Sequence, residues 1–242
     1  IYNFVPYSMY LDEYNDTEEE KVIYDEQIKI SDFKYGKKDL VSVPSKISVT
    51  AIKSGKFAET NVDILTSPRF INSEKSGIDR GNALHKVMQK FVPATDMDLK
   101  YVSAQIEKMK EKGLISEDEA VLVKNEKILD FYNSELGMRV IKSGTAVREA
   151  PFETDVPLSV FEGCEDSSEK ILLQGIIDCY FTENDKVILI DYKSDFYNSV
   201  SEIKEKYAKQ LEWYAYAIEK ITGRQVAEKY IYTFSKNETV LC

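Results

Sequence analysis

Two aspartates between residues 175 and 193 could together hold a divalent cation, and a lysine in the same segment could lie beside it. The surrounding sequence predicts two strands, at 170–181 and 187–193, because both are rich in β-branched and aromatic residues and the intervening TENDK consists of turn formers. Side chains two residues apart share one face of a strand. Asp191 and Lys193 therefore share a face, and Tyr192 points to the other.

The pairing of these strands determines whether the two aspartates meet. If the hairpin turns at Asn184 and Asp185, Asp178 lies directly opposite Asp191. Opposite Cβ atoms are about 4.5–5.5 Å apart, so the two carboxylates would repel each other. A cation between them would remove the repulsion, and oxygen ligands with room for water suit Mg²⁺ or Mn²⁺. Lys193 would then lie beside the metal, able to orient or deprotonate a water or to stabilise charge on a phosphate.

A plainer interpretation of the same residues stays open. Asp178 could face solvent near a strand end, with Asp191 and Lys193 forming a surface pair. The facing arrangement depends on the position of the turn, since a slip of one residue in the pairing moves the side chains of a strand to its other face.

Four further residues are candidates for the same site, each with a structural alternative. His85, the single histidine, lies on a predicted helix and is either a metal ligand or a structural residue. Glu149 is either a site carboxylate or a surface charge. Gln210 and Tyr214 are four residues apart and share one helix face, where they either contact a ligand or form the rim and the core.

Hydrophobic periodicity predicts the elements that would position these residues. Helices are expected over residues 79–92, 98–112, 116–134 and 201–221; strands over 146–160, 170–181, 187–193 and 230–234; an extended segment and a helix start over 41–53. This order indicates an α/β domain with a small mixed β-sheet flanked by helices. We expect residues 41–242 to form that domain, and residues 1–40 to form an N-terminal helical extension or a linker from a preceding module.

The composition of the chain argues against several classes of protein. The formal net charge of −10 argues against a generic basic coat for nucleic acid, although one local site could still act on nucleic acid if a metal supplies positive charge. No apolar run approaches the ~20 residues of a membrane span. Cys164, Cys179 and Cys242 lie in no CxxC motif, which argues against a zinc or iron–sulfur site and fits a reducing cytosol. The chain begins at Ile1, so we expect it to be part of a longer polypeptide.

Five motifs then occur in a characteristic order: RGNALHKVMQ, REAPF, GIIDCYF, LIDYKSD and QLEWYAYA. Together they resemble the RecB-type branch of the PD-(D/E)XK nucleases, and VPSKISVTAIK resembles the start of AddA-type nuclease domains. The resemblance covers roughly residues 41–242. No single motif is specific, and the ordered set carries the likeness.

The resemblance implies a restriction-endonuclease-like (PD-(D/E)XK) core and a role for each candidate. The implied metal ligands are His85, Asp178, Asp191 and the backbone carbonyl of Tyr192. Lys193 would be the catalytic lysine, and Glu149 a further acidic residue. Gln210 and Tyr214 would steady the site or touch the DNA backbone.

The same resemblance implies a metal-dependent DNA exonuclease acting at DNA ends in double-strand-break repair and recombination, in the cytoplasm. The expected partners are DNA, an AddB-like partner protein and a helicase part of the same polypeptide; no iron–sulfur cluster is expected. ATP use is not expected here, because no phosphate-binding glycine loop is present. Two alternatives stay open: a free-standing RecB-like exonuclease, and a nuclease-fold module that only binds DNA or a partner protein.

Overall fold

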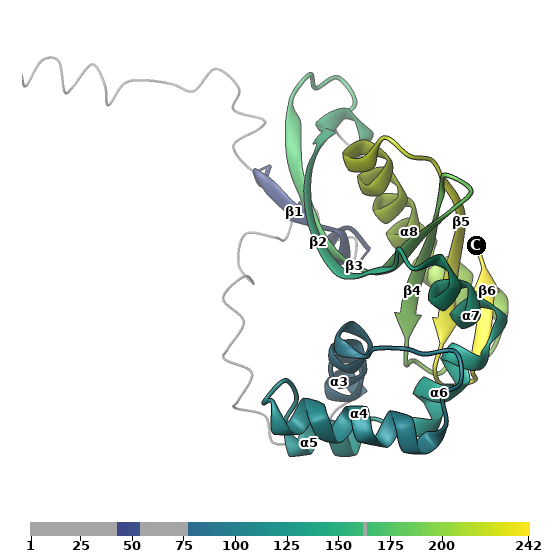
Figure 1. Cartoon of the computed structure of the whole chain (residues 1–242). Coiled ribbons are helices and arrows are strands. Elements are labelled where there is room, and N and C mark those ends of the chain that lie inside the picture. Colours follow the sequence, from purple (N-terminus) through teal and green to yellow (C-terminus); the bar gives the residue numbers. More distant parts are fainter. Residues whose placement is uncertain (1–42, 54–76, 162–163) are drawn as a thin grey trace, which may run out of the picture. The chain divides into compact units, whose positions relative to one another are not determined.

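The computed structural model describes residues 43–53, 77–161 and 164–242 (Figure 1). These residues hold seven α-helices and a mixed sheet of six strands. The expected α/β class, with helices flanking a small mixed sheet, is confirmed. The extension predicted for residues 1–40 lies outside the described residues.

The longest strand, β3, organises the sheet. It spans Lys170–Glu183 and pairs along its length with antiparallel β2 (Val147–Pro157). On its other side its first half pairs with parallel β1 (Lys46–Ser48), and its second half with antiparallel β4 (Lys186–Lys193). The sheet then continues through β5 (Val226–Thr233), parallel to β4, to β6 (Glu238–Leu241).

The hairpin between β3 and β4 has the predicted register. Cys179 pairs with Ile190 and Glu183 with Lys186, so the turn falls on Asn184 and Asp185. Both turn residues have positive φ angles, 48° and 63°. That conformation is the two-residue turn whose twist matches that of antiparallel strands, and asparagine and aspartate adopt it more readily than most residues. The local sequence therefore fixes the register on which the site depends.

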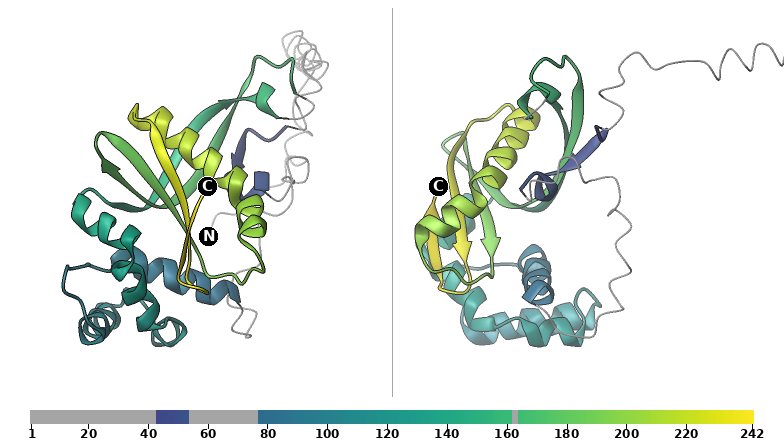
Figure 2. Two further views of the ribbon diagram at one scale, coloured as in Figure 1. Left: turned by 90° about the vertical axis from the view of Figure 1, so that its right-hand side faces the viewer. Right: turned by 180° about the vertical axis from the view of Figure 1, so that it is seen from behind.

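A single long helix, α8 (Val200–Thr222), connects β4 to β5. The Ser199 side chain accepts from the amide of Glu202 at its start, and Gly223 ends it with φ of 69°. Because β4 and β5 are parallel, the connection must cross the sheet, and a helix is the usual means. Helix α8 therefore lies over one face of the sheet (Figure 2).

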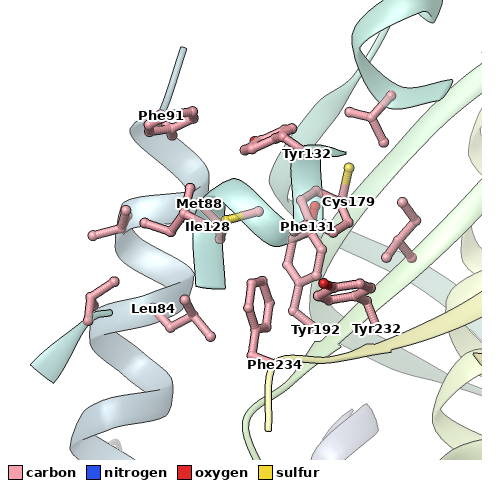
Figure 3. Close-up of a cluster of buried hydrophobic side chains, with 14 of the residues drawn as sticks. Leu84, Met88, Phe91, Ile128, Phe131, Tyr132, Cys179, Tyr192, Tyr232 and Phe234 are labelled. Carbon is pink, nitrogen blue, oxygen red and sulfur yellow. The ribbon is translucent and has the colours of Figure 1, made fainter. Parts of the chain in front are cut away.

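The other face is covered by α3–α7, which surround an aromatic core (Figure 3). Ile188, Ile190 and Tyr192 of β4 belong to this cluster, whereas Asp191 and Lys193 contact α8. The predicted division of β4 between two faces is thus confirmed. Since nearly every β4 side chain is buried, the strand is central, and polar groups on it need partners.

One of the helices predicted for this face, over residues 116–134, is divided in the structure. The helices on this face are α3 (Gly77–Lys90), α4 (Leu99–Glu111), α5 (Glu117–Leu122), α6 (Asn125–Asn133) and α7 (Glu135–Ser143). The single helix predicted over 116–134 is wrong, because the chain leaves helical geometry at Val123, which is 7% exposed and turns into the core. Two elements were not predicted: α7 and the short edge strand β6.

The remaining predicted elements are present with shifted ends. The segment predicted over 41–53 contains β1 and then α2 (Val49–Lys53), which contacts α8. The strand predicted over 146–160 ends at Pro157 and closes in a short 3₁₀ turn, Leu158–Val160. The last predicted strand starts earlier, at Val226, because its first residues pair with β4. Among the described residues no helix is both long and apolar enough to cross a membrane.

Candidate metal centre

Three acidic residues lie in a row across neighbouring strands. The pairs Arg148–Cys179 and Ala150–Ile177 flank Glu149 and place it across from Asp178. Cys179 also pairs with Ile190, which places Asp191 beside Asp178 on the other side. The three carboxylates therefore come from the neighbouring strands β2, β3 and β4, and Figure 1 shows that β4 ends near α3.

Glu149 has an unusual backbone conformation for a strand residue. Its φ is +48°, a region that residues other than glycine rarely enter. Such a conformation costs of order 1–3 kcal/mol and persists only where its surroundings enforce it. Here the irregularity lies at the point where the Glu149 carboxylate meets His85, whose Nδ1 is 3.0 Å from Glu149 Oε1.

His85 comes to this row from α3. Its Nδ1 lies 3.3 Å from Asp178 Oδ1 as well as close to Glu149. Burial alone would lower the pKa of His85, but hydrogen bonds to Asp178 and Glu149 outweigh burial and raise the pKa to about 10. One ligand atom from each of His85, Glu149 and Asp178 lies within 4.8 Å of the other two.

Asp178, at the centre of the row, is 7% exposed. Burial would raise its pKa, but His85, Lys193 and a hydrogen bond from the Tyr192 amide outweigh burial and lower it. The Tyr192 amide donates to Asp178 Oδ2 over 2.7 Å, while the Tyr192 side chain lies in the aromatic core. The burial of Asp178 contradicts the alternative in which it faces solvent.

Asp191 is fully buried and is held by two partners. Gln210 Nε2 donates to its Oδ1 over 3.0 Å, and Lys193 Nζ lies 2.6 Å from its Oδ2. Burial raises the pKa of Asp191 although Lys193 opposes the shift. The Lys193 side chain is 14% exposed, so the alternative of a surface pair is also contradicted.

Gln210 and Tyr214 lie together behind Asp191. Gln210 Nε2 also lies 3.0 Å from the Tyr214 hydroxyl, and both residues are buried on the inner face of α8. Gln210 thereby fixes the orientation of the Asp191 carboxylate. This is the same helix face that the four-residue spacing predicted.

Tyr207 is a site neighbour that is not among the candidate residues predicted from the sequence. Its ring centroid lies 4.7 Å from Lys193 Nζ, and its hydroxyl donates to Asp195 Oδ2 over 2.5 Å. A cation over an aromatic face is stabilised by the ring quadrupole. The available signal was spacing, because Tyr207 precedes Gln210 by three residues and so shares its helix face.

The donor set suits a divalent cation. It combines one imidazole nitrogen with clustered carboxylates, and the His85 imidazolium holds two of these carboxylates together. Asp191 Oδ2 is a buried oxygen, and the Lys193 ammonium lies 2.6 Å from it. Asp191 does not belong to the group of His85, Glu149 and Asp178, whose ligand atoms lie within 4.8 Å of one another. It lies beside Asp178 through the pairing of β3 with β4.

The fold agrees with the sequence relationships of the chain. Residues 56–240 match the PD-(D/E)XK nuclease superfamily, and the chain belongs to that superfamily. It therefore contains a nuclease domain, with the helix-flanked mixed sheet expected for this class.

The curated relatives compared with this chain are all of one kind of nuclease. The A subunit of an ATP-dependent helicase/nuclease from Clostridium novyi is 35% identical over 94% of this chain and 20% of the relative. Proteins of the same name from Ruminiclostridium cellulolyticum and Clostridium botulinum (strain Loch Maree / Type A3) are 36% and 34% identical, over 86% and 88% of this chain and 18% of each relative. The chain thus spans about a fifth of the length of these relatives.

Proposed function

We propose that this chain is a divalent-metal-dependent deoxyribonuclease that hydrolyses phosphodiester bonds at DNA ends. The observation that carries the proposal is the row of Glu149, Asp178 and Asp191, with His85 and Lys193 beside it. Mg²⁺ or Mn²⁺ would be held by His85, Asp178, Asp191 and the Tyr192 carbonyl, with Glu149 adjacent. When bound, such a cation neutralises phosphate charge and lowers the pKa of a water ligand.

Lys193 is suited to stabilise negative charge on the phosphate. Burial would lower its pKa, but the carboxylates of Asp191 and Asp178 outweigh burial and raise it. A lysine that keeps its proton is a poor general base and a good electrostatic partner for a developing oxyanion. Tyr207 and Asp191 limit where its ammonium can lie.

The relatives support a wider role that we also propose. The domain would act as an exonuclease within a cytoplasmic helicase–nuclease in double-strand-break repair and recombination. Its partners would be an AddB-like protein and a helicase part of the same polypeptide. We expect no ATP use and no iron–sulfur cluster in these 242 residues.

The test is cleavage of end-labelled DNA by the 242-residue chain with Mg²⁺ or Mn²⁺, resolved on a denaturing gel. Lys193→Ala and Asp191→Asn should each lower the cleavage rate by about 10²–10³-fold, the usual effect of removing one preorganised electrostatic group. Chelation of the metal with EDTA should abolish cleavage.

A matched control pair lies on the same sheet. Lys170 and Asp155 form an exposed ion pair, 2.5 Å apart, between β3 and β2. Lys170→Ala and Asp155→Asn should leave the cleavage rate within about twofold of the parent, because exposed ion pairs contribute little. Equal activity of all four variants would refute the assigned site, and Mn²⁺ binding without cleavage would instead support a binding module.

A further inference from the structure

The side chain of Arg148 joins the end of α3 to strand β2. Its Nη1 donates to the backbone carbonyl of Phe91, the residue that follows α3 by one position. The last carbonyls of a helix have no partner within the helix and carry the negative end of its dipole, so a guanidinium suits this position. Phe91 is itself held firmly, because its buried ring stacks on that of Tyr132 with 5.2 Å between the centroids (Figure 3).

Arg148 has no ion pair that would explain its position. In the described parts of the chain no carboxylate forms an ion pair with its guanidinium, and its Nε is buried without a hydrogen-bond partner. A partly buried charge costs free energy unless polar groups surround it. The bond to the Phe91 carbonyl therefore accounts for where the guanidinium lies.

A second contact joins the same two elements one residue further along β2. Glu149 Oε1 lies 3.0 Å from Nδ1 of His85 on α3. Neighbouring side chains of a regular strand point to opposite faces, yet Arg148 and Glu149 both reach this helix or its end. The positive φ of Glu149, +48°, lies between the two contacts. A strained backbone persists only where its surroundings enforce it, and two bonds to one helix supply such surroundings.

Helix α3 needs directional contacts to orient His85. Its apolar residues, among them Leu84 and Met88, pack into the aromatic core, but apolar attraction has no preferred direction. Within the described part of the chain, the hydrogen bonds from α3 and the residue after it to the sheet are those of His85 and of the Phe91 carbonyl. The bond between His85 and Glu149 must break if His85 becomes a metal ligand through Nδ1, whereas the bond from Arg148 can persist.

We propose that Arg148 is a positioning residue, which ties the end of α3 to β2 and thereby keeps His85 beside Glu149 and Asp178. The inference rests on the proposed nuclease function, because the reaction is what makes the position of His85 important. Arg148 itself touches neither the metal nor the DNA, and it acts only through the placement of His85.

The first test observes His85 directly in the protein without metal. The chain contains one histidine, so labelling with ¹⁵N-histidine gives the NMR signals of a single imidazole. The Nδ1–H proton exchanges with water when its hydrogen bond to Glu149 opens. Arg148→Met removes the donor and keeps an apolar stem, and it should raise this exchange rate about tenfold or more, the usual effect of losing a hydrogen bond from a charged group.

A milder variant keeps the test valid if Arg148→Met does not fold. Arg148→Lys retains the positive charge but has a shorter reach and no planar fork of donors. Its exchange rate should therefore lie between those of the parent and Arg148→Met. Circular dichroism shows which variants are folded.

Arg139→Met is the matched control. Arg139 also ties a helix to the sheet, since it lies on α7 and donates to Glu183 of β3 and to Glu228 of β5. Its removal breaks more hydrogen bonds than the removal of Arg148 does, so it should lower Tm at least as much. The exchange rate of His85 should nevertheless stay within about twofold of the parent, because distant sites act independently.

The second measurement is the cleavage of end-labelled DNA. Arg148→Met should lower kcat about 10- to 100-fold, because a displacement of about 1 Å in a reacting group can cost that much. KM should stay within about twofold, because Arg148 does not contact the substrate. Arg139→Met should change neither constant by more than about twofold.

The outcomes separate this inference from the proposed function. An unchanged exchange rate in the folded Arg148 variants, an equal rise in Arg139→Met, or an unchanged kcat in Arg148→Met overturns the positioning role, and cleavage by the parent then still supports the nuclease function. If the parent does not cleave DNA but the exchange rate of His85 depends on Arg148 and not on Arg139, the proposed function fails and the tie between Arg148 and His85 stands.

Discussion

At the scale of single residues, the environment of Lys193 is the most informative feature of the site. Its ammonium is held by Asp191 and lies over the ring of Tyr207. The contact with Tyr207 does not follow from the DYK motif alone, because Tyr207 comes from a helix that starts after the motif. Correct placement of the lysine therefore depends on how α8 packs against β4.

We predict that Tyr207→Leu lowers kcat for DNA cleavage about 5- to 30-fold and leaves KM nearly unchanged. The loss corresponds to ~1–2 kcal/mol for a desolvated cation over an aromatic ring. Tyr207→Phe keeps the ring and should retain most of the activity. Tyr216→Leu is the control, since Tyr216 lies on the same helix and its hydroxyl donates to Asp155 O. A fall in kcat of the same size in both leucine variants would contradict the role of Tyr207.

We predict that His85 makes the affinity of the proposed site for its metal dependent on pH. Its imidazolium, with a pKa of about 10, holds its proton near Glu149 and Asp178 below that pH, and a metal must displace this proton to use Nδ1. The affinity for Mn²⁺ should therefore rise with pH, by up to about tenfold per unit between pH 6 and 8. Calorimetry in buffers of different ionisation enthalpy measures both the affinity and the released proton. An affinity independent of pH would contradict this prediction.

The residues of the site differ in how far the sequence predicts them. Asp191 and Lys193 follow from strand alternation, and Asp178 from the turn formers at Asn184 and Asp185. The four-residue spacing placed Gln210 and Tyr214 on one helix face. That this face contacts Asp191 depends on how α8 crosses the sheet between β4 and β5, which the spacing does not show. The positive φ of Glu149 has no local sequence signal, because it arises where β2 meets β3 and α3.

At the scale of elements, the corner between α6 and α7 shows where periodicity fails. The Ser134 side chain accepts from the Gly137 amide and starts α7 immediately after α6 ends. Gly137 then lies against the end of α6, where a Cβ atom would be 2.0 Å from Phe131 O. The helix predicted over 116–134 ends at this corner, but periodicity does not predict that a second helix starts there at once.

Gly137→Ala should therefore destabilise the protein strongly. The added methyl group meets backbone atoms that cannot rotate away, and overpacking of this kind costs ~3 kcal/mol. For a protein of this size that loss lowers Tm by about 10 °C. Thermal unfolding followed by circular dichroism measures the shift, and Glu135→Ala, an exposed change on the same helix, is the control. A Tm within about 2 °C of the parent would contradict the close contact.

At the scale of the whole molecule, the site joins both layers of helices to the sheet. His85 comes from the layer of α3–α7, Gln210 from α8, and the carboxylates from three strands between them. Cation binding at the proposed site would therefore tighten contacts across the fold. The helices within each layer were largely predictable from hydrophobic periodicity. The meeting of the two layers at one row of carboxylates was not predictable, because it depends on the pairing of strands that are distant in the sequence.

Mn²⁺ should consequently raise Tm, and EDTA should reverse the rise. A ligand at about 100 times its Kd stabilises the folded state by ~2.7 kcal/mol. That free energy corresponds to a rise in Tm of about 5–10 °C for a chain of this length. Asp178→Asn should remove most of the shift, while Asp155→Asn, an exposed aspartate of β2, should keep it. Equal shifts in both variants would place the cation elsewhere.

The pairings of β3 with β2 and with β4, which build the acidic row, also determine when the proposed site can form. Displacing β2 or β4 by one position along β3 would send a carboxylate to the far side of the sheet. The proposed nuclease site would therefore form only late in folding, and a partly unfolded chain should cleave nothing.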